Sequence, residues 1–161
     1  MKAVFKLAWS QFKQSRYDKA LDNFLSILDN KQSQGKLTAG GLAAEVSEAE
    51  ADFINDTLRV VSLSLSYQEG AASIERLFNN QQGRIYEALL YRHLAQLFLK
   101  KQRISDAAEV YLRYAKQHPN KVLAAEFHSL AISAYETGNF HDLALNTKKS
   151  FVSQYGVNTI F

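Results

Sequence analysis

Small and aromatic residues recur along this chain at the spacing of a helix face, and this recurrence limits the possible folds more than any other feature. Residues at positions i, i+3, i+4 and i+7 share one face of a helix. The clearest example begins with a stripe on one helix face. A second pair of one small and one aromatic residue follows it, and then comes the single proline of the chain. In chain order, the stripe is Tyr91, Leu94, Ala95 and Phe98, the pair is Ala107 and Tyr111, and the proline is Pro119. The spacing predicts two helices packed as an antiparallel hairpin, with alanines where the backbones approach closely.

The same offsets return in other parts of the chain with a period near the 34 residues of a helix–turn–helix repeat. The first thirty residues carry them at Leu7, Ala8, Ala20 and Phe24. A looser copy follows residue 124, and a degenerate copy lies between residues 55 and 87. We therefore expect about four repeats, at approximately 1–30, 55–87, 88–121 and 124–157.

This pattern resembles the tetratricopeptide repeat family. The resemblance implies an all-α fold, a right-handed superhelix of antiparallel helix pairs that forms a single repeat domain over residues 1–161. It also assigns the repeat-packing positions, which are Leu7, Ala8, Ala20, Phe24, Tyr91, Leu94, Ala95, Phe98, Ala107, Tyr111 and Pro119. The stretch from Ala115 to Phe140 is also similar to repeats in bacterial envelope proteins, such as outer-membrane assembly lipoproteins.

The first and second repeats are separated by an insertion, with a loop expected at about residues 30–46. Glycines and polar residues in this stretch favour turns. Ser47, followed three residues later by Glu50, forms a capping-box pattern and predicts a helix that runs to about Tyr67. We expect a tolerated surface loop; the alternative is a lid over the binding groove.

Neither end of the chain has the polar capping repeat that a helical stack needs. The chain starts inside a predicted helix, and residues 158–161 resemble the opening of another repeat. We expect an excerpt of a longer array, with possible self-association through the uncapped ends. No signal peptide or membrane span is predicted, so the expected location is the cytoplasm, or the bacterial periplasm or cell envelope if an export signal lies upstream.

The residue types that catalysis and cofactor binding require are missing or scattered. The chain has no cysteine and only four histidines, and these lack the spacing of a metal site. No phosphate-binding glycine motif and no nucleophile elbow is present. We expect no enzyme activity, no cofactor and no metal, and we read the acidic run from Glu45 to Asp56 as solvated charge at a helix start.

Charge is unevenly distributed although the formal net charge is only +3. Basic residues outnumber acidic ones between residues 88 and 121, and acidic residues prevail between 35 and 87. Solvated faces with weak pairing between neighbouring repeats explain this distribution. A nucleic-acid patch is a less favoured alternative, because its basic side chains would come from two helices and a turn.

In the tetratricopeptide repeat family, the first helix of each repeat lines a concave groove. The resemblance implies groove-binding roles for Arg59, Tyr67, Arg92, Gln96, Lys100, His128 and Tyr135. The asparagines of the family's clamp for C-terminal carboxylates are absent here, which disfavours a chaperone-tail partner. In the first repeat, Phe5, Trp9 and Phe12 give the helix a second apolar side. We expect a missing upstream repeat or the 30–46 loop to cover that side; the alternative is a hydrophobic anchor site.

The sequence therefore predicts a non-catalytic scaffold module that binds a protein or peptide of unknown identity in its concave groove. The groove's charges and rings suit an acidic or carboxylate-bearing peptide with an aromatic or aliphatic anchor. One alternative is a structural spacer within a larger assembly. The other, less favoured, is a nucleic-acid binder through the basic third repeat.

Overall fold

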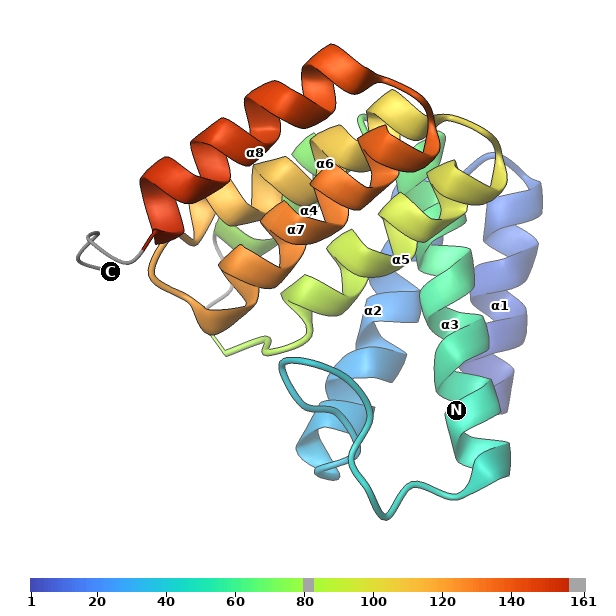
Figure 1. The fold of residues 1–161 in the computed structure, drawn as a ribbon. Coiled ribbons are helices and arrows are strands. Elements are labelled where there is room, and N and C mark those ends of the chain that lie inside the picture. The colour runs from blue at the N-terminus through green and yellow to red at the C-terminus, as the bar shows by residue number, and fades with distance from the viewer. Residues whose placement is uncertain (80–82, 157–161) are drawn as a thin grey trace. The chain divides into compact units, whose positions relative to one another are not determined.

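The computed structural model describes residues 1–79 and 83–156, and every regular element in this part of the chain is a helix (Figure 1). The all-α prediction is confirmed. The predicted repeat opening at residues 158–161 lies outside the described residues. The helices are α1 (Lys2–Lys13), α2 (Tyr17–Ser33), α3 (Glu48–Ser66), α4 (Ala71–Asn79), α5 (Glu87–Lys100), α6 (Ile104–Gln117), α7 (Val122–Thr137) and α8 (His141–Tyr155).

Within the described ranges, no helix combines the length and the apolar character that crossing a bilayer would require. The chain divides into two compact units, residues 1–94 (unit 1) and residues 95–161 (unit 2), and the division falls within α5. In unit 1, α2 packs against both α1 and α3. In unit 2, α7 packs against both α6 and α8. The boundaries of the four repeats stay a prediction.

Three of the helix hairpins turn through a residue in the left-handed region of backbone space. These residues are Ser15, Gln102 and Asn139, with φ of 58°, 59° and 61°. In each turn, the backbone N–H of the next residue donates to the carbonyl oxygen five residues earlier, at 2.9 to 3.0 Å. This is the Schellman arrangement, which satisfies carbonyl groups at a helix end. The hairpins therefore share one turn geometry, although none of the three residues is a glycine.

Gly138, which ends α7, is required by close packing. A Cβ atom at this position would lie 2.7 Å from Cγ2 of Ile104 at the start of α6 and 2.8 Å from the Phe140 ring. Its φ of −81° is accessible to any residue. The absence of a side chain therefore serves the contact with α6 rather than the turn.

Most of the predicted repeat-packing residues are buried. Tyr91, Leu94 and Ala95 line the covered side of α5, and Ala107 and Tyr111 line that of α6. The remaining buried members of the set are Ala8, Ala20, Phe24 and Phe98.

Two members of the predicted packing set are exposed. Contrary to the prediction, Leu7 is 52% exposed, because α1 packs on α2 and α3 through its other sides. Pro119 is exposed in the connection between α6 and α7. A proline cannot continue a helix, so it marks the end of α6 rather than a packing contact.

The loop between α2 and α3 is anchored at both of its ends. The helix α2 continues to Ser33, slightly past the predicted loop start, and Leu37 in the loop is buried. The Nζ atom of Lys31 lies 2.6 Å from an Oε atom of Glu50. This hydrogen bond lowers the pKa of the Glu50 carboxyl group. The ion pair thus joins the last turns of α2 to the start of α3.

The helix α3 begins where the capping-box pattern predicts, since Ser47 is its N-cap residue. The Ser47 side chain makes no capping hydrogen bond. Glu50 pairs with Lys31, as described above, instead of closing the box. The boundary is confirmed, whereas the hydrogen bonds expected of a capping box are not formed.

A polar network fastens the segment before α5 to α2. Arg84 donates two hydrogen bonds to the Asp29 carboxylate, at 2.8 and 2.7 Å, and the Tyr86 hydroxyl donates a third at 2.5 Å. Burial and the hydrogen bond to Asp29 raise the pKa of Tyr86. We call these three residues the Asp29 latch.

Candidate functional site

The exposed members of the predicted groove set come from both units. In unit 1, Tyr67 is 59% exposed, and the Arg59 guanidinium is exposed but paired with Asp56, with Nη2 2.5 Å from Oδ1. Arg92 is half-buried. In unit 2, Gln96 and Lys100 are exposed. These side chains are available to a partner to different degrees.

His128 lies in the interior of unit 2, not on an open surface. It is 4% exposed, and its Nε2 atom lies 3.2 Å from the Thr147 carbonyl oxygen on α8. Because a carbonyl only accepts, Nε2 carries the proton. The rings of Phe151 and Tyr155 meet the imidazole edge to face. Burial lowers the pKa of His128, although the Thr147 hydrogen bond opposes this shift.

Tyr135 is also buried, at 8% exposure, with the Phe140 ring against it. Burial raises the pKa of its hydroxyl, and the nearby Glu109 carboxylate adds to that effect. The prediction that His128 and Tyr135 are exposed groove residues is therefore wrong. The reason is that α7 packs against both α6 and α8, and His128 and Tyr135 lie on its covered sides.

The second apolar side of α1 is covered within unit 1 by neighbouring helices. The Phe5 ring contacts Phe24 on α2 and Phe53 on α3, with ring centroids 5.4 and 5.5 Å apart. Phe12 contacts Tyr67, at the end of α3, at 5.9 Å. The helices α2 and α3 thus cover part of this side, and further cover by an upstream repeat or by the 30–46 loop stays a prediction.

Four rings gather where α1 ends, where α2 begins and where α3 ends. The Trp9 and Phe12 rings stack at 5.3 Å, and the Tyr17 and Tyr67 rings stack at 5.3 Å with an interplanar angle of 4°. Phe12 joins the two pairs through an edge contact with Tyr17. We call Trp9, Phe12, Tyr17 and Tyr67 the aromatic cluster. Only Tyr67 among them is mainly exposed.

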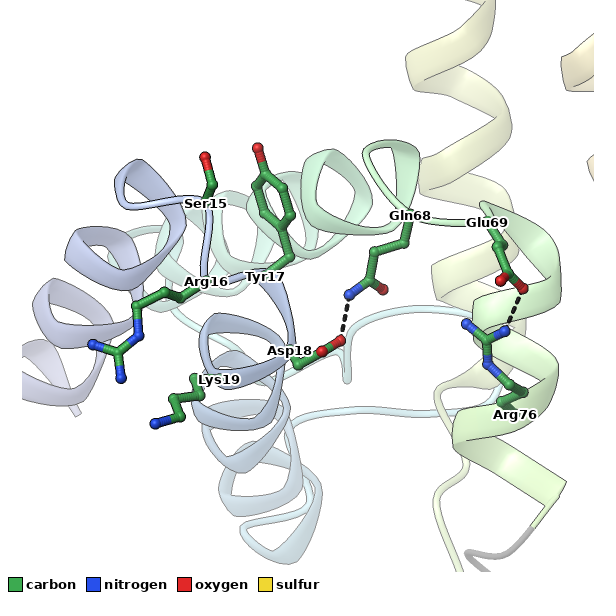
Figure 2. A pocket seen from close by; sticks show the side chains of 8 residues that line it. All are labelled: Ser15, Arg16, Tyr17, Asp18, Lys19, Gln68, Glu69 and Arg76. Atoms are coloured by element: carbon green, nitrogen blue, oxygen red, sulfur yellow. Dashed lines mark hydrogen bonds and ion pairs between the residues drawn. The ribbon is translucent and has the colours of Figure 1, made fainter.

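A pocket of about 540 Å³ adjoins the aromatic cluster and shares Tyr17 with it. This volume is within the range of small-ligand and peptide side-chain pockets. We call it the turn pocket, since the α1–α2 turn and the start of α2 supply one wall and the α3–α4 connection with α4 supplies the other (Figure 2). It is lined by Ser15, Arg16, Tyr17, Asp18, Lys19, Gln68, Glu69 and Arg76.

Hydrogen bonds hold the two walls of the turn pocket in place. The Gln68 amide donates to Oδ1 of Asp18 at 2.6 Å and so connects the walls directly. On the second wall, Arg76 pairs with Glu69. In Figure 2, Arg16 and Lys19 extend away from these pairs, on the α1 side. Neither side chain has a hydrogen bond or ion pair with any residue in the ranges 1–79 and 83–156.

The described residues contain no group of three or more side chains that could hold a metal ion. A smaller pocket of about 220 Å³ in unit 2, between Pro119 and Tyr155, is lined by few charged groups. Unlike this smaller pocket, the turn pocket is lined by several charged side chains and shares Tyr17 with a cluster of rings.

Reasoning from the sequence identified one residue of this surface, Tyr67, as a groove residue. It placed Trp9 and Phe12 on an apolar side of the first helix, but it assigned no role to Arg16, Lys19 or Gln68. The missing information is the contact between two turns about fifty residues apart in the chain. A helical pattern describes one element at a time, so it holds no signal for such a pocket.

Comparison with known families matches residues 2–30 and 81–121 to a model described as tetratricopeptide repeat. The two matched segments contain α1 with most of α2, and α5 with α6. A search of curated proteins found no match. A search of solved structures found none either.

Proposed function

Because this chain is a tetratricopeptide-repeat protein, we propose that it acts as a non-catalytic module that binds a protein or peptide partner. Tetratricopeptide repeats in general serve as scaffolds for protein–protein interaction. The proposal applies that role to this chain and assigns it no reaction.

The observation that carries the proposal is the exposed side of the aromatic cluster. Tyr67 keeps 59% of its surface open to solvent while its ring stacks on Tyr17. Aromatic side chains held rigidly at a surface are common anchors in protein interfaces. The rings are positioned by packed helices, so a partner meets a surface that needs little reorganisation, and little binding free energy is spent on ordering it.

Each unit also has exposed groove positions of its own, Arg59 in unit 1 and Gln96 with Lys100 in unit 2, and we propose them as further contacts within their own unit. Their charged and polar ends would steer an acidic partner. Arg92, which is half-buried, would contribute less contact area. His128 and Tyr135 are not part of the proposed surface.

The test is to capture partners from the source cell with the immobilised chain and then to measure the affinity of an identified partner for variants. We expect Tyr67→Ala and Lys100→Glu to weaken binding at least tenfold. The matched control Lys149→Glu changes an exposed residue of α8 and should leave the affinity unchanged. Circular dichroism would verify that each variant keeps its helices.

Equal affinity of the partner for wild type, Tyr67→Ala and Lys100→Glu would remove the proposed surface from the interaction. Failure to capture any partner would favour a structural spacer within a larger assembly. Binding of nucleic acid that falls steeply with salt would favour the nucleic-acid alternative.

A further inference from the structure

The turn pocket and the aromatic cluster form one continuous surface, because Tyr17 belongs to both. One part supplies an open stacked pair of rings, and the other supplies a hollow with polar walls. Both parts lie within unit 1. Together, the rings and the polar walls indicate which side chains a partner needs in order to bind this surface.

The carboxylates of the turn pocket are already engaged, whereas two of its cations are not. Asp18 accepts a hydrogen bond from Gln68, and Glu69 pairs with Arg76. Arg16 and Lys19 are exposed, and neither of their side chains has a hydrogen-bond or ion-pair partner in the part of the chain that the structure describes. The charge left available to a ligand is therefore positive.

A third cation lies beside the aromatic cluster. The Nζ atom of Lys13 is 5.6 Å from the centroid of the Trp9 ring, which is within the range of a cation–π contact. Lys13 thus lies beside the Trp9 ring of the cluster, and Arg16 and Lys19 line the turn pocket together with Tyr17. Charge complementarity calls for carboxylates next to an aromatic anchor.

We propose that this surface of unit 1 binds an acidic peptide segment that carries an aromatic side chain. The aromatic side chain stacks on the Tyr17–Tyr67 pair, and flanking Asp or Glu carboxylates pair with Arg16 and Lys19. The inference rests on the proposed function, since it names the chemistry of the partner and the place where it binds.

The walls of the turn pocket favour a peptide over a nucleic acid. Single-stranded nucleic acid also uses rings and cations, and it presents a phosphate at every nucleotide. Although Asp18 is hydrogen-bonded and Glu69 is paired, both stay exposed and charged, and a strand with a phosphate at every nucleotide would bring some phosphates next to them. A peptide has backbone N–H groups that can donate to these carboxylates, and its acidic side chains can be spaced to avoid them.

The experiment is selection from a phage-displayed library of random 12-residue peptides on the folded full chain. Wild type should enrich peptides with Asp or Glu beside Trp, Tyr or Phe. Binding of one enriched peptide, labelled with fluorescein and measured by anisotropy, should weaken at least tenfold in Arg16→Glu/Lys19→Glu and in Tyr67→Ala. Tyr67→Phe keeps the ring and should restore binding.

The matched control is Lys2→Glu/Lys6→Glu, which makes the same charge change nearer the other end of α1. It should leave the affinity within a factor of two of wild type. Selection on Arg16→Glu/Lys19→Glu should in turn favour basic peptides. Enriched peptides without acidic residues, or equal loss of affinity in the control, would overturn the inference.

Nucleic acid is tested in parallel with a labelled 20-nucleotide oligo-dT strand. Tighter binding of this strand than of the enriched peptide, abolished in Arg16→Glu/Lys19→Glu, would also overturn the inference. If peptides are enriched but bind through Lys100 instead, the inference fails while the proposed function stands. If the folded chain enriches no peptide and captures no protein partner, both fail.

Discussion

At the scale of single residues, the polar groups with the greatest structural consequence are those that join segments far apart in the sequence. The Asp29 carboxylate accepts hydrogen bonds from Arg84 and from Tyr86, and the Arg84 side chain is only 15% exposed. A charge-assisted, two-pronged hydrogen bond of this kind is stronger than a neutral one. Removing the acceptor leaves a largely covered guanidinium without its counterion.

Asp29→Ala should therefore lower the free energy of unfolding by about 1 to 3 kcal/mol, the usual cost of leaving a covered donor unsatisfied. Urea denaturation followed by circular dichroism measures the change. Asp52→Ala, at an exposed position of α3, is the control and should cost much less. Equal stability of wild type and Asp29→Ala would mean that the latch contributes nothing.

His128 makes stability depend on pH. Burial lowers its pKa in the folded state below the ordinary value of 6.5, so the unfolded chain takes up the proton first as pH falls. The contribution of neutral His128 to the stability of the folded state is therefore fully present above about pH 6.5. It is lost as pH falls through the lowered pKa. We expect wild type to be less stable at pH 5.5 than at pH 7.5.

His128→Phe should reduce that difference between the two pH values, whatever its effect on absolute stability. His141→Gln, at an exposed position of α8, should leave the difference unchanged. Chemical denaturation of the three proteins at both pH values supplies the comparison. If His128→Phe shows the same difference in stability between the two pH values as wild type, the pH dependence comes from other groups.

At the scale of elements, small residues set how closely paired helices pack. Ala95 on α5 and Ala107 on α6 are both fully buried. Larger side chains at such positions force neighbouring side chains and backbone to shift. The hairpin geometry therefore depends on residues that contribute little contact area themselves.

Ala107→Leu should cost about 1 to 3 kcal/mol of stability, as overpacking of a core usually does. Ala49→Leu, at an exposed position in the first turn of α3, is the matched control and should cost a few tenths of that or nothing. Thermal melts of both variants measure the change in stability relative to wild type. A wild-type melting temperature for Ala107→Leu would contradict close packing at this position.

At the scale of the whole molecule, apolar side chains remain open to solvent on α8. Leu145 is 52% exposed and Val152 is 66% exposed, and their spacing of seven residues places them on one side of the helix. The small net charge of +3 provides little repulsion between molecules. Association between copies is the expected consequence.

We expect the chain to self-associate at high concentration in sedimentation velocity experiments. Leu145→Lys/Val152→Lys should shift it towards the monomer. The control Ser150→Lys/Ser153→Lys adds the same charge without removing apolar surface and should shift it less. A wild-type chain that stays monomeric at every concentration would refute this expectation.

Local spacing in the sequence determined the helical character of the chain, several helix ends and the burial of most of the predicted repeat-packing residues. The start of α3 after Ser47 and the burial of Ala95 and Tyr91 follow from residues within one or two turns of each other. Such features depend on helix periodicity and end signals, which operate over a few residues. They could be predicted without knowing what each helix packs against.

Only the tertiary structure decided which sides of the helices stay open. His128, expected at an exposed position, is buried, and Leu7, expected in the core, is exposed. The reason is that burial depends on the neighbours that surround α7 and α1. The turns at Ser15 and Gln102 use left-handed residues that carry no glycine signal. The turn pocket and the Asp29 latch join segments about fifty residues apart. Contacts of that range arise from the packing of helices on one another, which the spacing of residues along a single helix does not specify.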